Sequence, residues 1–167
     1  NLQDLQYINL FNTLTIDDYY KTDTHWKQEN IIKVAEKLGK EMNFYVNTNV
    51  NIKSKGDFYG VYYGQMALGG NPDELKYVEN KEINNAKVYE LKQEEAKDVY
   101  NEEGTNSLDK YTYYLYGSVP LLTIKNDLAK NDKHLVIFRD SFGSSLTPLL
   151  ISGYSKIDVV DTRYISK

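Results

Sequence analysis

Residues 135–145 read LVIFRDSFGSS, and the expected architecture of the chain follows from this stretch. Its four consecutive apolar residues, Leu135 to Phe138, predict a strand that is buried on both faces. The apolar run stops at Arg139 and Asp140, and small residues then open a second apolar segment that is typical of a helix. A strand that turns sharply into a helix places the turn residue at the carboxyl end of a sheet, where α/β proteins bind ligands. That residue is Ser141.

Two interpretations of Ser141 are open at this point. Backbone N–H groups at a helix N-terminus stabilise developing negative charge, so a serine in this turn is suited to act as a nucleophile. The turn lacks the GxSxG form of the nucleophile elbow. The alternative is a helix N-cap, because Asp and Ser are preferred at that position. A nucleophilic role requires a base elsewhere in the chain.

Composition limits the possible function classes. The 167 residues are enough for one domain with a real core, and 41% hydrophobic with 26% charged residues is ordinary for a globular protein. A net charge of -4 gives no electrostatic basis for nucleic-acid binding. No apolar run approaches the roughly 20 residues that span a bilayer. The 16 tyrosines suit a sugar-binding or peptide-binding surface and equally suit half-buried strands. The absence of cysteine excludes disulfides and thiolate metal sites.

The C-terminal third predicts a strand–helix–strand unit. Strands at 135–138 and 157–160 flank a helix at 143–152, which implies parallel strands joined by a right-handed crossover. Another helix is expected from about residue 24–27 to 42, because apolar residues recur there at helical spacing. Residues 70–115 are mostly polar and charged, with one expected strand at 87–91, and we expect them to form an exposed, β-rich excursion.

His25 is the candidate base for Ser141. It lies in the sequence Asp-Thr-His-Trp at the expected start of the long helix, and Asp23 is close enough along the chain to orient its ring. The other histidine, His134, lies at the opposite end of the expected strand and is assigned a structural role. Asp23 as a helix cap beside an exposed His25, or a D-x-H metal half-site, are alternatives. The metal alternative lacks other obvious nitrogen or sulfur ligands.

Three segments carry a resemblance to a known family. Residues 20–26 (YKTDTHW), 138–142 (FRDSF) and 160–164 (VDTRY) together resemble the DHHW family of cell-envelope proteins. They are also similar to the alginate O-acetyltransferase group, whose fold is a permuted version of the SGNH hydrolases. The resemblance implies a triad of Asp23, His25 and Ser141. Thr24 stands where the family name has a second histidine, at a position outside the triad.

The resemblance also implies a fold and a function. The expected fold is α/β and SGNH-hydrolase-like, a mostly parallel sheet flanked by helices, in a single domain over 1–167. The chain begins at Asn1 and not at a methionine, so we expect it to be a piece of a longer protein. The resemblance implies that it is the C-terminal part of an extracytoplasmic protein of the cell envelope. The expected activity is that of a serine esterase or O-acyltransferase on acetyl esters of a glycan, without metal or cofactor, partnered by the polysaccharide and a membrane acyl-donor protein. The alternative is a non-catalytic glycan-binding or envelope-assembly module.

Three further residues are candidates for oxyanion or substrate binding. Gly60 is the candidate for the oxyanion-hole glycine of SGNH enzymes, with an ordinary turn glycine as the alternative. Asp161 and Arg163 follow the strand at 157–160 and are expected at the same sheet end as Ser141. They are assigned to substrate binding or to orientation of the site, with a structural salt bridge to Arg139 as the alternative. Asp161 is also the rival of Asp23 as the acid of the triad.

Overall fold

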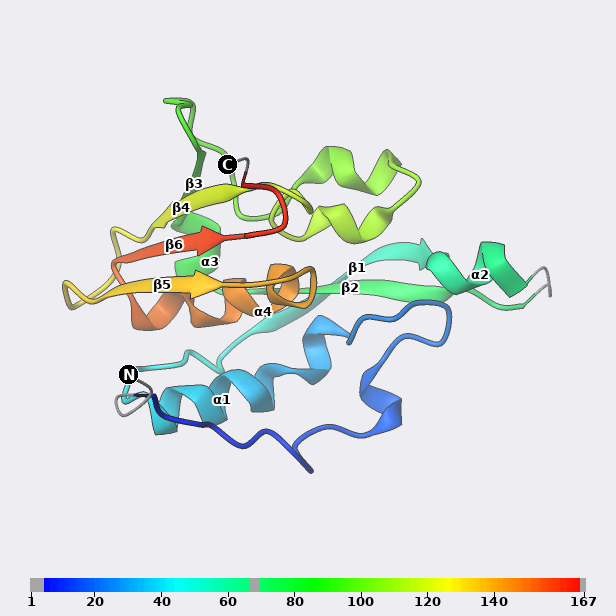
Figure 1. Cartoon of the computed structure of the whole chain (residues 1–167), viewed down its shortest axis with the longest axis horizontal. Helices are drawn as coiled ribbons and strands as arrows, with labels where there is room; N and C mark the ends of the chain where they lie inside the picture. The colour runs from blue at the N-terminus through cyan, green and yellow to red at the C-terminus, as the bar shows by residue number, and fades with distance from the viewer. Residues whose placement is uncertain (1–4, 67–69, 166–167) are drawn as a thin grey trace.

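The computed structural model describes residues 5–66 and 70–165 and shows a mixed α/β fold (Figure 1). Its main sheet has four strands in the order β3-β4-β6-β5. These strands are β3 (Lys87–Glu90), β4 (Leu121–Lys125), β5 (His134–Phe138) and β6 (Lys156–Val160). A separate antiparallel pair consists of β1 (Asn51–Phe58) and β2 (Asp73–Glu79).

The expectation of a mostly parallel sheet was wrong. Among the described strands, only β5 and β6 pair in parallel, whereas β4 pairs antiparallel with both β3 and β6. Parallel neighbours need a long crossover connection, and β5 and β6 have one in α4 (Phe142–Leu150). The predicted strand–helix–strand unit over 134–160 is thus confirmed, and the remaining strands reverse direction around it.

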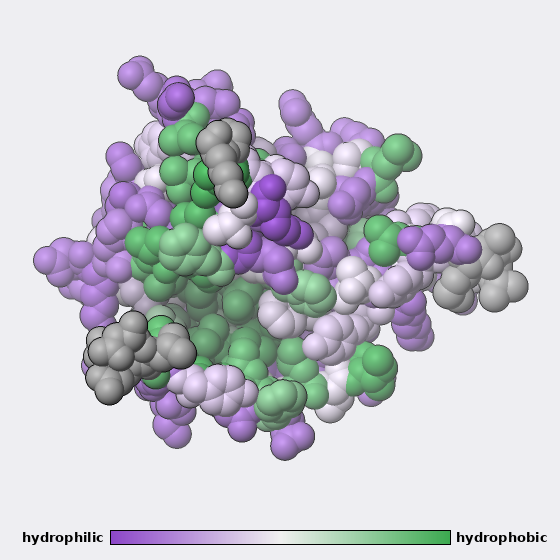
Figure 2. Space-filling view, viewed as in Figure 1, coloured by the Kyte–Doolittle hydropathy of each residue, from purple (hydrophilic) through white to green (hydrophobic). Residues whose placement is uncertain are grey.

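β5 was expected to be buried on both faces, and this was also wrong. It stands at one end of the sheet order, and its residues alternate in exposure. Leu135 and Ile137 pack against the core, whereas the side chains of Val136 and Phe138 are exposed. Figure 2 shows apolar side chains gathered around this strand on the visible face. A short apolar run does not by itself reveal whether one or both of its faces are covered.

The helices lie mainly on one side of the main sheet. α4 runs behind β5 in Figure 1, and α1 (Ile32–Glu41) packs against α4. Two shorter helices, α2 (Val61–Met66) and α3 (Lys81–Asn85), follow β1 and β2. Short 3₁₀ turns complete the described elements and are found at Ile16–Asp18, Gln28–Asn30, Glu102–Asn106, Lys110–Tyr113 and Ile151–Gly153. No helix within the described residues is long and apolar enough to span a membrane.

The long helix begins later than the sequence predicted. α1 starts at Ile32, and the residues before it form a tight loop closed by backbone hydrogen bonds. The Tyr20 N–H donates to the His25 carbonyl at 3.0 Å, and the Lys27 N–H donates to the Asp18 carbonyl at 2.8 Å. These bonds use the backbone groups that a helix would need, so the loop replaces the expected first turns.

Residues 70–115 do not form the exposed excursion that their composition predicted. They contribute β2, α3 and β3, and they supply fully buried tyrosines to the core. The rings of Tyr100 and Tyr113 are stacked with centroids 5.1 Å apart, and Tyr114 packs edge-on against both. Because a tyrosine ring is apolar over most of its surface, a tyrosine-rich segment can build a core while reading as polar.

Gln28 connects the smaller sheet to α4 through one buried side chain. Its amide donates to the Ser145 carbonyl at 2.8 Å, and its carbonyl accepts from the Val78 N–H at 2.8 Å. The Tyr100 hydroxyl also donates to that carbonyl, at 3.1 Å. Gln28 has no exposed surface, so all these groups depend on one another for partners. This network fixes the start of α4 against the loop that precedes α1.

Candidate active site

Ser141 lies between β5 and α4, where the sequence predicted a strand-to-helix turn. Its backbone is in the ordinary right-handed region, with φ -63° and ψ -26°, so it lacks the strain of a nucleophile elbow. Its hydroxyl makes no capping bond to the helix. Asp140 performs that task instead, because its carboxylate accepts from the Phe142 N–H at 3.0 Å. The N-cap interpretation of the Ser141 side chain therefore does not hold, and the hydroxyl is available for another partner.

That partner is His25. The distance between His25 Nε2 and Ser141 Oγ is 2.8 Å, although the two residues lie 116 positions apart in the sequence. On the other side of the ring, Nδ1 lies 2.5 Å from Asp23 Oδ1. The expected geometry, with Ser141 at one ring nitrogen and Asp23 at the other, is confirmed. His25 and Asp23 are 8% and 3% exposed, so neither depends on water to hold this arrangement.

Asp23 is held by more than the imidazole. Its Oδ1 also accepts from the His25 N–H at 3.0 Å, and its Oδ2 accepts from the Val61 N–H at 3.0 Å. Burial pushes the pKa of Asp23 upward, but the hydrogen bonds from His25 and Val61 outweigh it and leave that pKa below the ordinary value of 3.8. Asp23 therefore stays ionised at neutral pH and can stabilise a positive charge on His25.

Two aromatic residues hold the imidazole and the start of α4 in place. The Tyr111 ring stacks on the His25 ring, with centroids 3.8 Å apart and planes inclined by 13°. The Tyr111 hydroxyl lies 2.7 Å from Ser145 Oγ, and the Trp26 indole N–H donates to the same oxygen at 2.8 Å. This network was not predicted from the sequence. The available signals were Trp26 beside His25 and Ser145 one helical turn after Ser141.

Gly60 does not occupy the place of an oxyanion-hole residue. Its N–H donates to Thr22 Oγ1 at 3.1 Å, so that group is already bonded. A Cβ atom added to Gly60 would lie 2.3 Å from the Cβ of Asp23 and 2.4 Å from the Thr22 carbonyl oxygen. The glycine is thus required for the close approach of residues 60–61 to Asp23, which brings the Val61 N–H to the carboxylate.

Asp161 and Arg163 form a structural ion pair with Arg139, as the alternative interpretation held. The Arg163 guanidinium donates to both carboxylate oxygens of Asp161, at 2.9 and 2.7 Å, and Arg139 Nη1 lies 3.5 Å from Asp161 Oδ2. The hydrogen bonds from Arg163 are the main reason why the pKa of Asp161 lies below 3.8. Arg139 in turn donates to Ser144 Oγ at 2.8 Å. Asp161 therefore braces the start of α4, and Asp23 holds the acid position at His25.

A shallow hollow of about 480 Å³ flanks the Ser141 turn on the side of these arginines. Its lining includes Trp26, Phe138, Phe142 and the half-exposed side chain of Arg163. The hollow gives a ligand access to one side of the turn. Arg163 can still contribute to it, but its charge is shared with Asp161.

A metal site is not visible among residues 5–66 and 70–165, where no three His, Cys, Asp or Glu residues are grouped to hold an ion. The D-x-H pair at Asp23 and His25 is used internally, with Ser141 as the third member. His134, at the opposite end of β5, lies 2.7 Å from Asp158 Oδ2 and has the structural role that the sequence predicted.

No protein-family model matches the sequence, and no curated protein is similar to it at a significant level. Solved structures do match. A DHHW family protein from Eubacterium siraeum aligns with a TM-score of 0.76 and 21% identity, over 90% of this chain and 52% of that chain. PatB1 of Bacillus cereus with a sulfonyl adduct aligns with a TM-score of 0.69 and 18% identity, over 90% of this chain and 54% of that chain. A second PatB1 structure aligns with a TM-score of 0.62 and 18% identity, over 90% and 56%.

These matches establish a shared fold. The chain spans about half the length of the solved structures that it matches.

Proposed function

We propose that this chain is a serine esterase or O-acyltransferase that acts on acetyl esters of a glycan. The observation that carries the proposal is the continuous contact from Asp23 through His25 to the Ser141 hydroxyl. A hydroxyl bonded to an imidazole, which is bonded to a buried carboxylate, is the arrangement that activates serine for acyl transfer. In this proposal the fold is a variant of the SGNH hydrolases.

The first half of the reaction forms an acyl-serine. Ser141 Oγ attacks the acetyl carbonyl carbon while His25 Nε2 takes the hydroxyl proton, and Asp23 stabilises the resulting imidazolium. The negative charge passes to the carbonyl oxygen. In this proposal the Ser141 N–H at the start of α4 stabilises it, because the N-terminal end of a helix favours negative charge. The C–O bond to the leaving alcohol then breaks, and His25 returns its proton to that alcohol.

The second half regenerates the serine. A water molecule or a sugar hydroxyl loses its proton to His25 and attacks the acyl carbon, after which Ser141 leaves and recovers the proton. Water gives hydrolysis and a sugar hydroxyl gives transfer. In the proposed setting the chain works in the cell envelope or outside the cell, on a polysaccharide, and a membrane protein supplies the acyl group when the reaction is transfer.

The test is covalent labelling of the full chain with phenylmethylsulfonyl fluoride, followed by peptide mapping. PatB1 has been solved with a sulfonyl adduct, and sulfonyl fluorides react with serine hydroxyls that a neighbouring base activates. We expect the label on Ser141, and not on Ser54, which is exposed on β1 but has no histidine partner. His25→Ala should remove the label, and Ser141→Ala should abolish hydrolysis of p-nitrophenyl acetate.

A failure of labelling together with an unchanged hydrolysis rate in Ser141→Ala would contradict the proposal. The second function expected from the sequence, a glycan-binding or envelope-assembly module without catalysis, would then take its place.

A further inference from the structure

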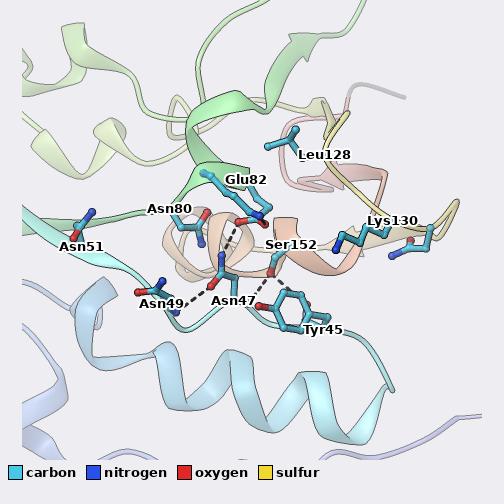
Figure 3. Close-up of a pocket in the computed structure, with 11 residues that line it drawn as sticks. Tyr45, Asn47, Asn49, Asn51, Asn80, Glu82, Leu128, Lys130 and Ser152 are labelled. Carbon is cyan, nitrogen blue, oxygen red and sulfur yellow. Dashed lines mark hydrogen bonds and ion pairs between the residues drawn. The ribbon is translucent and has the colours of Figure 1, made fainter.

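A second hollow, of about 670 Å³, lies at the far end of α4 from Ser141 (Figure 3). This volume is within the range of roughly 300–1,000 Å³ that is usual for ligand sites. It opens between the segment before β1, the start of α3 and the loop before β5, and it reaches Ser152 just after α4. A nine-residue helix is roughly 14 Å long, so this hollow is separate from the site around Ser141.

The floor of the hollow is built from polar side chains that hold one another. The Asn47 amide donates to Glu82 Oε2 at 2.7 Å, and the Asn47 N–H donates to Ser152 Oγ at 2.9 Å. The Asn49 N–H donates to the side-chain oxygen Oδ1 of Asn47 at 3.0 Å. Glu82 and Ser152 are 7% and 9% exposed. Because these groups are already fixed, a ligand that bonds to them does not have to order them.

The floor retains hydrogen-bonding capacity toward the hollow. A carboxylate offers about four acceptor positions, and Glu82 uses Oε2 for Asn47 while its Oε1 has Lys81 at the looser distance of 3.7 Å. Asn49, Asn51 and Asn80 add side-chain amides to the lining. Asn80 Oδ1 already accepts from the Ile83 N–H at 2.8 Å, so Asn80 offers its NH₂ group, whereas each of the other two amides carries both donors and an acceptor. An apolar ligand would leave these groups without partners, which is costly.

Tyr45 adds an apolar surface to the polar lining of the hollow. Its side chain lines the same hollow and is 64% exposed, a large fraction for a tyrosine beside so many polar groups. The ring presents a flat apolar face, and its hydroxyl can donate or accept at the edge. In Figure 3 the ring lies near Ser152, on one side of the Asn47 amide.

We propose that this hollow is a second binding site, which takes a neutral oligosaccharide. Sugar hydroxyls donate and accept at once, which matches neighbouring amides and a carboxylate, while the C–H face of a sugar ring matches the face of Tyr45. The lining carries charges of both signs, on Glu82 and on Lys81 and Lys130, so the preference for a neutral ligand rests on the amide groups and on Tyr45. Since the site lies at the other end of α4, its occupation does not depend on the chemistry of Ser141. If Ser141 acts on a polysaccharide, this site holds the same polymer at a second point.

The test is a titration of the full chain, labelled with ¹⁵N, with the neutral tetrasaccharide chitotetraose. We expect amide shifts in residues 45–51, 80–82 and 128–131. Tyr45→Ala should weaken binding at least tenfold, and Glu82→Gln should weaken it as well. Tyr62→Ala removes a tyrosine that is 40% exposed on α2, beyond the other end of β1, and it should bind like the unaltered chain.

Ser141→Ala separates this proposal from the esterase proposal, because it should leave these shifts unchanged whether or not the chain hydrolyses esters. Circular dichroism and the unfolding midpoint of Tyr45→Ala should match those of the unaltered chain, because the side chain is exposed. The proposal is overturned by shifts confined to the surroundings of Ser141, by the absence of shifts, or by unaltered affinity in a folded Tyr45→Ala.

Discussion

Replacing Gly60 with alanine tests whether the approach of residues 60–61 to Asp23 sets the geometry of the triad. The added Cβ would lie 2.3 Å from the Asp23 Cβ, whereas ordinary van der Waals contacts begin at 3.4 Å. The difference, 3.4 minus 2.3, is 1.1 Å, and the atoms it meets include the Asp23 Cα and the Thr22 carbonyl oxygen. Backbone cannot swing aside as a flexible side chain can, so Asp23 or the 60–61 segment must move.

The expected magnitude follows from that displacement. A misplacement of about 1 Å can lower a catalytic rate by roughly 10²-fold, and overpacking typically costs about 1–3 kcal/mol of stability. We therefore expect Gly60→Ala to hydrolyse p-nitrophenyl acetate about a hundredfold more slowly. Its urea unfolding midpoint should fall as well.

Gly64→Ala is the matched control. It lies four residues later in α2, and a Cβ added there would meet nothing within 4 Å. Alanine is favoured over glycine in a helix by up to about 1 kcal/mol, so this variant should retain activity and be equally or more stable. The reasoning is refuted if Gly60→Ala keeps both the rate and the unfolding midpoint of the unaltered chain. A lowered midpoint with a normal rate would mean that Asp23 tolerates the shift.

Three more predictions concern the groups around the site. Asp23→Asn should lower the esterase rate by about 10⁴-fold through loss of the correct imidazole tautomer. Asp161→Asn should mainly lower the unfolding free energy, by about 3–5 kcal/mol, because the buried Arg139 loses its carboxylate partner. Esterase rates and urea unfolding curves of the two variants check this ranking, and the reverse ranking would transfer the acid role to Asp161. Tyr111→Leu should lower kcat while changing KM little, because the His25 ring loses its stacking partner. Steady-state kinetics that show a change in KM alone would contradict this. The pKa values of Asp23 and Asp161 lie below 3.8 in the folded chain, so their stabilising contribution is full above the unfolded pKa and is lost as the pH falls through the folded values. The unfolding free energy should therefore decline between about pH 5 and pH 1. The decline should be less steep in Asp161→Asn, and an equal slope in that variant would argue against the effect.

Much of the local structure could be predicted because it depends on residues close in sequence. The strand–helix–strand unit over 134–160 follows from apolar runs separated by a small-residue turn. The pairing of Asp23 with His25 follows from a separation of two residues, which confines the carboxylate to the neighbourhood of the ring. The position of Ser141 at the carboxyl end of β5 follows from the same turn.

The sequence could not reveal which faces are covered or which way distant strands run. An apolar run looks the same in β5, whose Val136 and Phe138 are exposed, as it would in a buried strand. Residues 70–115 look polar, yet their tyrosines fill the core, because composition does not show which part of an amphipathic side chain is buried. Strand direction in the sheet depends on long connections that carry no simple periodic signal.

The sequence by itself determined the chemical parts of the candidate site, a serine at a strand-to-helix turn and an imidazole with its own carboxylate. Only the tertiary structure decided that these parts meet, since His25 Nε2 and Ser141 Oγ come within 2.8 Å across 116 residues. The physical reason is that the short backbone between Asp23 and His25 keeps this pair together, whereas the contact between His25 and Ser141 depends on how distant segments pack. Gln28, Tyr111 and Gly60 place the loop against α4 through burial, stacking and close approach, and none of these leaves a periodic trace in the chain.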